Sequence, residues 1–415
     1  MVDSLDRGSG PEAEAKRCLV IVMAGGQGQR LYPLTRRSAK PAVRFAGGYR
    51  IIDFTLSNCL NSGMKRLYVL AQYGSMSLLR HLRRGWGRLL SDDLGEFLEV
   101  LPPQQIVGDH WYAGTADAIF QNLYVLQQER PDVVVLLSGD HAYKMDYRPM
   151  VRRHLEAGAK LTIASLAVPI EHGKTLGVMT VDEAGQVIEF AEKPDDPKAV
   201  PGRPEECLVN MGVYVWDTRA LAQEVAADAR NDSSHDFGKD IIPSMVERGE
   251  GVYAYEFVDQ RTGKPAYWRD IGTLESYWST HMDLVSVLPE LDLYDQTWPL
   301  YTAHSTYPPA KTVLGHRAQL LDSLVCDGCV VSGAKVERSV LSPGVRVGEG
   351  AEIVESIIFD DVVVGPGARI YRGVIDEGMV IPDGFEIGYD AEADAKRFVV
   401  GPGGITVVPA GAALD

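Results

Sequence analysis

The C-terminal quarter of the sequence repeats itself without gaps, and this repeat restricts the possible folds more than any other feature. SVLSPGVRVGEGAEIVE (339–355) aligns on SIIFDDVVVGPGARIYR (356–372), GVIDEGMVIPDG (373–384) begins a third copy, and SLVCDGCVVSGAKVER (323–338) is one residue shorter. Val347 and Ile353 recur as Val364 and Ile370, with the same six-residue spacing. Such spacing predicts coils of about three short strands that stack into a β-helix. A β-sandwich with coincidental spacing is the alternative.

The first two thirds of the chain alternate short β-rich runs with helical stretches. The predicted strands lie at 18–24, 66–72, 133–140, 160–168, 177–182 and 209–217, and the predicted helices include 51–63, 116–130 and 147–158. Apolar strands separated by amphipathic helices predict a mostly parallel, Rossmann-like α/β sheet that is covered on both faces. Ligands of such sheets bind at the carboxyl ends of the strands.

A chain of 415 residues is too long for one compact core. The segment 291–315 is rich in proline and aromatic residues and has no regular period, which predicts a linker. We therefore expect a flexible tail at 1–16, an α/β domain at 17–290, a linker at 291–315 and a β-helix domain at 316–415.

The charge balance limits the possible partners. With 41 Lys and Arg against 57 Asp and Glu, the net charge of −16 would repel a nucleic-acid backbone. The N-terminus is polar, and no apolar run approaches the roughly 20 residues that a membrane-spanning helix needs. We therefore expect a soluble, cytoplasmic protein with neither a nucleic-acid nor a membrane partner.

Cysteine usage fits a reducing compartment, because five cysteines are scattered along the chain. Cys326 and Cys329 form a CxxC, but no second pair and no histidine lies nearby in the sequence. We interpret them as turn residues in preference to a metal or redox site.

Three glycines and a basic cluster follow the first predicted strand, in MAGGQGQRLYPLTRRSAKPAVRF (23–45). Gly25, Gly26 and Gly28 would let backbone N–H groups approach a ligand closely. Arg30 and Lys40 flank a short proline-containing loop and could converge on neighbouring phosphates. The GGxGxR spacing matches neither of the common nucleotide motifs.

Purely structural interpretations of this stretch also remain open. The glycines alone could form an ordinary turn. A solvated basic face is as good an account of Arg36, Arg37 and Arg44 taken individually.

Two acidic residues are candidates for a metal site. Asp140 ends an apolar strand, and Asp270 lies far away in YWRDIGT. If the fold brings these carboxylates together, they could hold Mg²⁺, which prefers oxygen ligands. For a lone aspartate at a strand end, a helix cap is the commoner role.

Several motifs in order give the chain a resemblance to a known family. AGGQGQRLYPLTRRSAKPAV, RIIDFTLSNCLNSG, YAGTADAIFQN, SGDHAYKMDY, EFAEKP, SSHDFGKDIIP and YWRDIGTLESYW resemble the motifs of sugar-nucleotide pyrophosphorylases, and specifically of the bacterial glucose-1-phosphate adenylyltransferases. The resemblance covers about residues 17 to 400. It implies a nucleotidyltransferase domain, a left-handed β-helix, the substrates ATP and glucose 1-phosphate, and the product ADP-glucose for glycogen synthesis.

The resemblance also implies residue roles. Arg30 and Lys40 would contact the triphosphate and the departing pyrophosphate, and Asp140 and Asp270 would hold the catalytic Mg²⁺. The sugar phosphate would meet Tyr112, Gly177, Glu192, Lys193 and Asn210. Beside the three glycines, the nucleotide would meet Gln72, Gln104, Gln105, Trp111, Gly114, Thr115 and Asp117. Without the resemblance, EKPDDP would be interpreted as a solvated turn.

Regulation and assembly are likewise implied, as sugar-phosphate effectors and a homotetramer. Arg37, Arg50, Arg372 and Arg397 could form an anion site between the two domains. The chain departs from many relatives in having Asn210 in place of serine, and from relatives activated by fructose 1,6-bisphosphate in having Arg37 in place of lysine and VVGPGG in place of a further arginine. The identity of the effector therefore stays open.

Three alternative functions remain: a nucleotidyltransferase for another nucleoside triphosphate, a bifunctional enzyme whose β-helix transfers acetyl groups, and a non-catalytic regulatory subunit. Acetyl transfer is disfavoured because about four coils are short and His304 and His316 both precede the repeat. A regulatory subunit would be expected to lack Asp140, Arg30 or Lys40, and all three are present.

Overall fold

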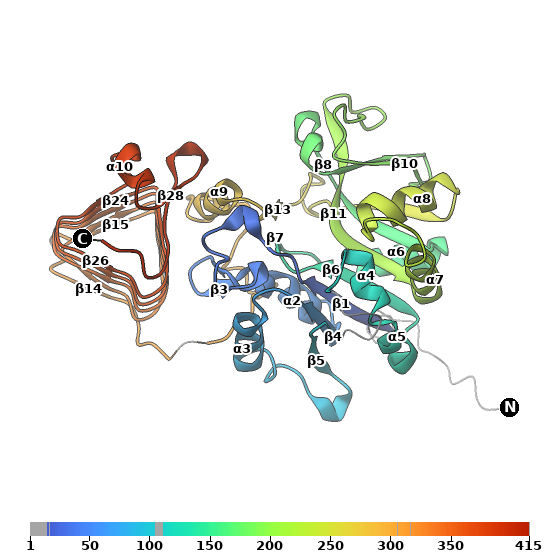
Figure 1. The fold of residues 1–415 in the computed structure, drawn as a ribbon, viewed down its shortest axis with the longest axis horizontal. Coiled ribbons are helices and arrows are strands. Elements are labelled where there is room, and N and C mark those ends of the chain that lie inside the picture. The colour runs from blue at the N-terminus through green and yellow to red at the C-terminus, as the bar shows by residue number, and fades with distance from the viewer. Residues whose placement is uncertain (1–14, 16, 104–110, 305, 316, 415) are drawn as a thin grey trace.

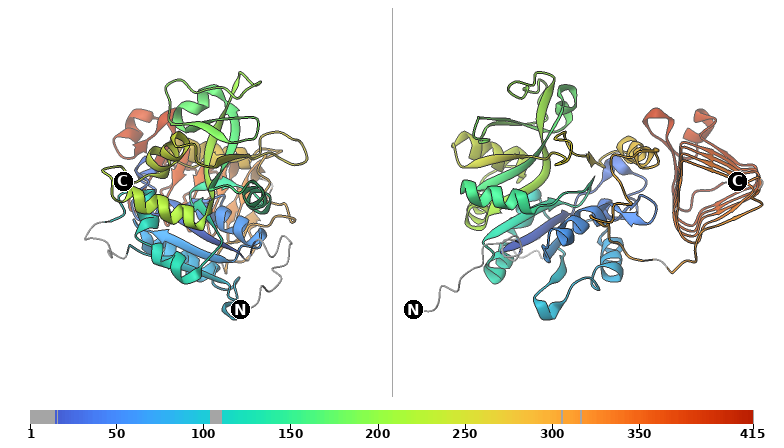
Figure 2. Two further views of the ribbon diagram at one scale, coloured as in Figure 1. Left: turned by 90° about the vertical axis from the view of Figure 1, so that its right-hand side faces the viewer. Right: turned by 180° about the vertical axis from the view of Figure 1, so that it is seen from behind.

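The computed structural model describes residues 15, 17–103, 111–304, 306–315 and 317–414, arranged as a large α/β part and a separate prism of stacked strands (Figure 1). Figure 2 shows the same two parts from the side and from behind. Of the predicted N-terminal tail, only Ala15 is among the described residues.

One nine-stranded sheet forms the centre of the α/β part. Its order is β10-β9-β11-β6-β1-β4-β5, and β8 joins β11 to β12. The strands are β1 (Cys18–Ala24), β4 (Arg66–Ala71), β5 (Phe97–Leu101), β6 (Val133–Ser138), β8 (Leu161–Pro169), β9 (Gly177–Val181), β10 (Val187–Glu192), β11 (Glu206–Asp217) and β12 (Val252–Glu256). The strands β5, β4, β1 and β6 run parallel, whereas β11 is antiparallel to its neighbours β6, β8 and β9.

Both faces of this sheet are buried, because successive residues of a strand point to opposite faces. On β1, Val20 and Val22 belong to one apolar core, and Leu19 and Ile21 belong to the other. The near-continuous apolar runs in the sequence therefore mark strands that are covered on both sides, as predicted.

Helices and short strands surround the sheet. They are β2 (Arg44–Phe45), β3 (Tyr49–Arg50), α2 (Ile51–Asn61), α3 (Ser75–Gly85), α4 (Thr115–Phe120), α5 (Leu123–Glu129), β7 (His141–Tyr143), α6 (Arg148–Ala157), α7 (Thr218–Asp228), α8 (Ile242–Glu247), β13 (Trp268–Asp270) and α9 (Leu274–Leu284). Single helical turns occur at η1 (Gln29–Leu31), η2 (Lys40–Ala42), η3 (Asp92–Leu94), η4 (Ile170–Thr175) and η5 (Phe237–Ile241).

The prediction of one helix over 116–130 was wrong, because α4 and α5 are separate. Between them, the Gln121 side chain donates to Asp117 and the Asn122 side chain donates to the backbone oxygen of Ala118. Side-chain bonds of this kind compete with helix continuation.

The C-terminal part is a parallel β-helix with three faces. The first face is β14 (Lys311–Val313), β17 (Val330–Ser332), β20 (Arg346–Val347), β23 (Val363–Val364) and β26 (Val380–Ile381). The second is β15 (Gln319–Leu321), β18 (Lys335–Glu337), β21 (Glu352–Val354), β24 (Arg369–Tyr371) and β27 (Glu386–Ile387). The third is β16 (Leu324–Val325), β19 (Val340–Leu341), β22 (Ile357–Ile358), β25 (Gly373–Ile375), β29 (Thr406–Val408) and β28 (Val399–Val400). Near the C-terminus, α10 (Ala391–Ala395) and η6 (Pro402–Gly404) flank β28.

The predicted repeat maps directly onto these coils. Val336, Ile353, Ile370 and Ile387 pair in register from coil to coil, and each is fully buried. The copy that is one residue shorter loses that residue in the turn between β17 and β18. The first coil begins with β14, inside the segment predicted as a linker, and the remaining domain boundaries stay predictions.

The third face of the β-helix packs against the α/β part around β2, β3 and α9 (Figure 1). One apolar core holds Phe45 and Tyr277 from the α/β part together with Val340 and Ile357 from the β-helix. Polar contacts reinforce the junction: the Trp278 indole donates to the backbone oxygen of Glu355 at 2.7 Å, and Arg44 pairs with Asp360. The two parts therefore share a packed interface.

Among the residues that the structure describes, no helix is long and apolar enough to cross a membrane. All five cysteines are free thiols. Burial raises the pKa of Cys326 to about 12 and that of Cys329 to about 11, which opposes formation of the reactive thiolate.

The junction contains a fully buried histidine that predicts acid sensitivity. His281 accepts the backbone N–H of Ala46 at Nε2, so Nδ1 carries the proton and donates to the backbone oxygen of Tyr277. Burial lowers the pKa of His281 to about 4, although the bond to Tyr277 opposes the shift. The unfolded chain takes up this proton below a pKa of about 6.5, so the stability that neutral His281 contributes is lost as the pH falls.

We expect His281→Gln, which cannot titrate, to lose about 2 kcal/mol less free energy of unfolding between pH 7 and pH 5 than the parent does. Chemical denaturation at the two pH values measures the difference. The exposed residue His172, changed to Gln, is the control and should leave the drop as it is in the parent. An equal drop in the parent and in His281→Gln would contradict the assignment.

Candidate active site

Three parallel strands end side by side and gather the predicted nucleotide residues at one edge of the sheet. Gly25 follows β1, and Gln72 follows its neighbour β4. A Cβ added at Gly25 would lie 3.2 Å from the Cβ of Gln72, so the segments that follow these two strands are in contact. At Gly28 the backbone has φ of 62°, which favours glycine, and an added Cβ would meet Lys40 and Thr35 at 2.9 Å.

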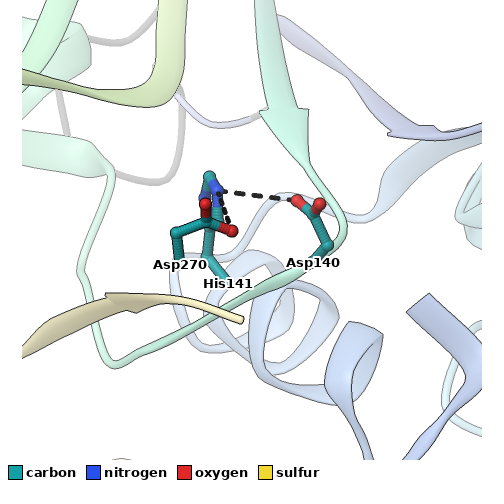
Figure 3. Close-up of side chains that lie close together, drawn as sticks. All are labelled: Asp140, His141 and Asp270. Carbon is teal, nitrogen blue, oxygen red and sulfur yellow. Dashed lines mark ion pairs between the residues drawn. The ribbon is translucent and has the colours of Figure 1, made fainter. Parts of the chain in front are cut away.

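The structure brings Asp140 and Asp270 together, as the sequence analysis required. Asp140 follows β6, and the short strand β7 then pairs antiparallel with β13, which places Asp270 opposite His141. Ligand atoms of Asp140, His141 and Asp270 all lie within 4.8 Å of one another. Figure 3 shows the three side chains converging.

Lys40 completes this group of charges. Its ammonium lies 2.5 Å from Oδ2 of Asp140 and 3.4 Å from Oδ1 of Asp270, and the residue is only 7% exposed. Burial opposes the charge on Lys40, but the two carboxylates outweigh it and raise the pKa of the ammonium. Burial alone would raise the pKa of Asp140, but Lys40, His141 and Ser138 hold it below its usual range.

Two residues that the sequence analysis did not assign hold these acids in place. The Ser138 hydroxyl donates to Oδ1 of Asp140 at 2.7 Å. His141 directs Nε2 toward both carboxylates, at 3.5 Å from Asp140 and 3.9 Å from Asp270 (Figure 3). The His141 ring packs edge-to-face on Trp268, with 4.9 Å between centroids.

Arg30 lies beside Asp270 but makes no ion pair with any residue that the structure describes. Its guanidinium would be 3.2 Å from a Cβ added at Gly272, and Asp270 would be 2.8 Å from the same position. The side chain is exposed and available to an incoming anion.

Four of the five residues predicted for the sugar phosphate, Gly177, Glu192, Lys193 and Asn210, gather at the adjoining part of the sheet, whereas Tyr112 lies in the loop before α4. Glu192, at the end of β10, pairs with Gly177 at the start of β9, and a Cβ at Gly177 would be 2.8 Å from a Glu192 oxygen and 3.4 Å from Asn210. Lys193 has a positive φ of 51°, and its ammonium lies 3.6 Å from Glu192. More than half of the Lys193 side chain is exposed.

Asn210 and Glu192 have further partners within the protein. The Asn210 amide donates to the Tyr214 hydroxyl at 2.8 Å and accepts the backbone N–H of Gly212 at 2.9 Å. Burial, with the nearby Asp236 charge, raises the pKa of Glu192, while Lys193 opposes the rise. A carboxylate that is partly desolvated gains from hydrogen-bond donors such as sugar hydroxyls.

Asp236, which was not among the predicted site residues, links the residues predicted for the sugar phosphate to those predicted for the nucleotide. Its carboxylate accepts from the backbone of Gly238 and from the Thr115 hydroxyl at 3.1 Å. A Cβ at Gly238 would lie 3.2 Å from Glu192. An aspartate that caps the following helical turn in SSHDFGKD was the available signal.

The loop before α4 contains the remaining predicted nucleotide residues. Trp111 is half exposed and stacks on Tyr73, with 5.3 Å between ring centroids. Gln72 donates to the backbone oxygen of Tyr112 at 3.5 Å, and the Tyr112 hydroxyl accepts from Asn122 at 3.0 Å. Gln104 and Gln105 lie outside the described residues.

Gly114, Thr115 and Asp117 form the support of this loop. A Cβ at Gly114 would lie 2.2 Å from the backbone oxygen of His235, so only glycine fits here. Asp117 is buried and accepts from the backbone of Ala113 and from Gln121. Both bonds go to Oδ2 of Asp117, so this carboxylate fixes the loop from within.

Two of the four predicted regulatory arginines line one cleft of the molecule. Arg37 and Arg50 line a cleft between the two parts of the molecule; its charged lining residues are Arg36, Arg37, Arg44, Arg50, Asp376 and Glu377. Arg372 instead packs over Trp278 at 4.2 Å and donates to the backbone oxygen of Gly403. Arg397 lies over Phe385 and Phe398, outside the lining of the cleft.

The residues at the converging acids fit a divalent metal ion. Asp140 and Asp270 offer hard oxygen ligands, and both remain partly exposed, with side-chain accessibilities of 25% and 30%. No other group of three or more His, Cys, Asp or Glu within the described ranges converges in this way. When bound, such an ion would polarise phosphate oxygens and neutralise their charge.

Comparison with known proteins agrees with this geometry. Residues 19–287 match the family model described as nucleotidyl transferase, and residues 308–408 match the GlmU-like, C-terminal hexapeptide model. These matches confirm the predicted fold class, a nucleotidyltransferase domain followed by a left-handed β-helix.

Curated relatives match nearly the whole chain. Glucose-1-phosphate adenylyltransferase 2 of Alkalilimnicola ehrlichii is 48% identical over 95% of this chain and 93% of its own length. The glucose-1-phosphate adenylyltransferase of Thiobacillus denitrificans is 50% identical over 95% of this chain and 90% of its own length. That of Paramagnetospirillum magneticum is 46% identical over 99% of this chain and 98% of its own length. The chain thus belongs to the nucleotidyl transferase family and, within it, to the glucose-1-phosphate adenylyltransferases.

Proposed function

We propose that this chain transfers the adenylyl group of ATP to glucose 1-phosphate, giving ADP-glucose for glycogen synthesis and releasing pyrophosphate. The observation that carries the proposal is the meeting of Asp140, Asp270 and Lys40 at the end of β6, beside the glycine-rich turn. Cations and metal-holding acids at one point suit a reaction that brings the phosphates of two substrates together, with the attacking and leaving oxygens in line at one phosphorus.

Each side of the site has a task in this reaction. Arg30 and Lys40 would neutralise the triphosphate and the departing pyrophosphate, since this transfer depends on placement and charge neutralisation and needs no covalent nucleophile on the protein. Lys193 would bind the phosphate of the sugar, and Glu192 and Asn210 would accept or donate to its hydroxyls. Asp140 and Asp270 would hold Mg²⁺, the divalent ion that phosphate transfer most often uses.

The first test removes one metal ligand. We expect Asp140→Asn to lower kcat by about 100-fold or more, because a neutral amide holds a divalent metal ion more weakly than a carboxylate does. Pyrophosphate release measures the rate, and circular dichroism checks the fold. Asp146→Asn, at an ion pair with Arg148, is the control and should retain the parent rate. Parental turnover in Asp140→Asn would refute the metal assignment.

The second test addresses the sugar phosphate. We expect Lys193→Gln to raise the KM for glucose 1-phosphate by about 10-fold or more while changing the KM for ATP little, since one charge-assisted contact is lost. Lys198→Gln, at an exposed pair with Glu189 of β10, is the matched control. An unchanged KM for glucose 1-phosphate in Lys193→Gln would remove the role.

We further propose that four copies assemble and that sugar phosphates regulate them through the cleft between the two parts. Burial, together with the neighbouring Arg44, lowers the pKa of Arg50 to about 10, so an anion placed there would be favoured. Arg37 is exposed and makes no ion pair with a described residue. These features support Arg37 and Arg50 as the effector site in preference to Arg372 and Arg397.

Arg37→Ala should raise the half-activating concentration of fructose 6-phosphate or fructose 1,6-bisphosphate several-fold, because one anion contact is lost. Rates of ADP-glucose synthesis over a range of effector concentrations give this value, and light scattering of the same samples gives the assembly state. Arg397→Ala serves as the comparison. If Arg397→Ala shifts the value and Arg37→Ala does not, the effector site lies elsewhere.

A further inference from the structure

The ammonium of Lys40 occupies the space between the two acids that the proposed metal ion would use. It contacts Asp140 at 2.5 Å and Asp270 at 3.4 Å. Within the part of the chain that the structure describes, no other lysine or arginine pairs with either acid.

A metal ion and this ammonium cannot share the position. Mg²⁺ binds oxygen ligands at about 2.0 to 2.1 Å, so an ion held by Oδ2 of Asp140 and Oδ1 of Asp270 would enter the volume that the ammonium fills. Two cations at such a distance repel strongly in a partly buried site. Binding of the ion therefore requires the Lys40 ammonium to leave.

The position of the Lys40 stem limits where the displaced ammonium can go. A Cβ added at Gly28 would lie only 2.9 Å from the Cβ of Lys40, so the stem borders the glycine-rich turn. The backbone of Lys40 is fixed in η2, beside α3, where the backbone N–H of Ala39 donates to the Ser77 hydroxyl at 3.3 Å. Rotation about the side-chain bonds alone would turn the ammonium toward the proposed position of the phosphates.

We propose that Lys40 is the resident cation of the metal site in the nucleotide-free chain and that it exchanges places with the metal ion when the triphosphate binds. The triphosphate supplies the anionic partner that the displaced ammonium needs. The free metal ion should consequently bind weakly, and metal and nucleotide should enter together. This inference rests on the proposed function, because it takes Asp140 and Asp270 as the metal ligands.

Direct binding of Mn²⁺, measured by electron paramagnetic resonance without substrate turnover, tests the exchange. In the absence of nucleotide, Lys40→Met should bind Mn²⁺ at least about tenfold more tightly than the parent, because no ammonium competes for the acids. Lys65→Met, which removes a lysine paired with Glu96 at 2.7 Å elsewhere, is the matched control and should bind as the parent does.

A non-hydrolysable nucleotide supplies the second half of the test. α,β-Methylene-ATP should tighten Mn²⁺ binding in the parent by more than it does in Lys40→Met, since only the parent must displace an ammonium. Circular dichroism confirms the fold, and Lys40→Gln repeats the measurement if Lys40→Met does not fold.

The outcomes separate this inference from the proposed function. If adding Asp140→Asn to Lys40→Met abolishes the tight Mn²⁺ site, the ion lies between the acids as proposed. If the double variant keeps that site, the metal assignment of the proposed function fails, and the exchange fails with it. If Asp140→Asn weakens Mn²⁺ binding to the parent but Lys40→Met and Lys40→Gln bind no more tightly than the parent, the exchange alone is overturned.

Discussion

The pairing of two very short strands, β7 and β13, is the contact on which the site depends. It places Asp270 opposite His141 and therefore beside Asp140, although the two acids are far apart in the sequence. The parallel order of β4, β1 and β6 brings the glycine-rich turn to the same edge. Charge then collects there, because carboxyl ends of parallel strands leave room for ligands and cannot be covered by the crossover helices.

Other contacts connect this edge of the sheet to two further parts of the molecule. On one side, Asp236 joins the start of α4 to the segment around Glu192, so the residues proposed for the nucleotide and those proposed for the sugar phosphate share one support. Toward the β-helix, the chain that leads from Lys40 through β2 to Arg50 also lines the cleft with Asp376 and Glu377.

The sequence predicted those features that follow from local pattern. The β-helix register could be predicted because residues at equivalent positions of the 16- and 17-residue repeats pair with one another on neighbouring strands. Val336, Ile353 and Ile370 are an example. The strand ends were readable because apolar runs stop where polar residues begin. Contacts made only by the folded chain were not readable: the pairing of Lys40 with both acids, the link from Asp236 to Thr115, and the side-chain bonds that divide α4 from α5. The packing of Arg372 over Trp278 likewise depends on how the β-helix docks on the α/β part, which no local pattern encodes.

The central claim is that one rim of the sheet gathers the phosphates of both substrates around a carboxylate-held metal ion. A crystal structure with Mg²⁺, a non-hydrolysable ATP analogue and glucose 1-phosphate tests it most directly. We expect the ion between Asp140 and Asp270, the triphosphate along the glycine-rich turn beside Arg30, and the sugar phosphate on Lys193. Phosphates bound away from these side chains, with no ion on either aspartate, would contradict the account.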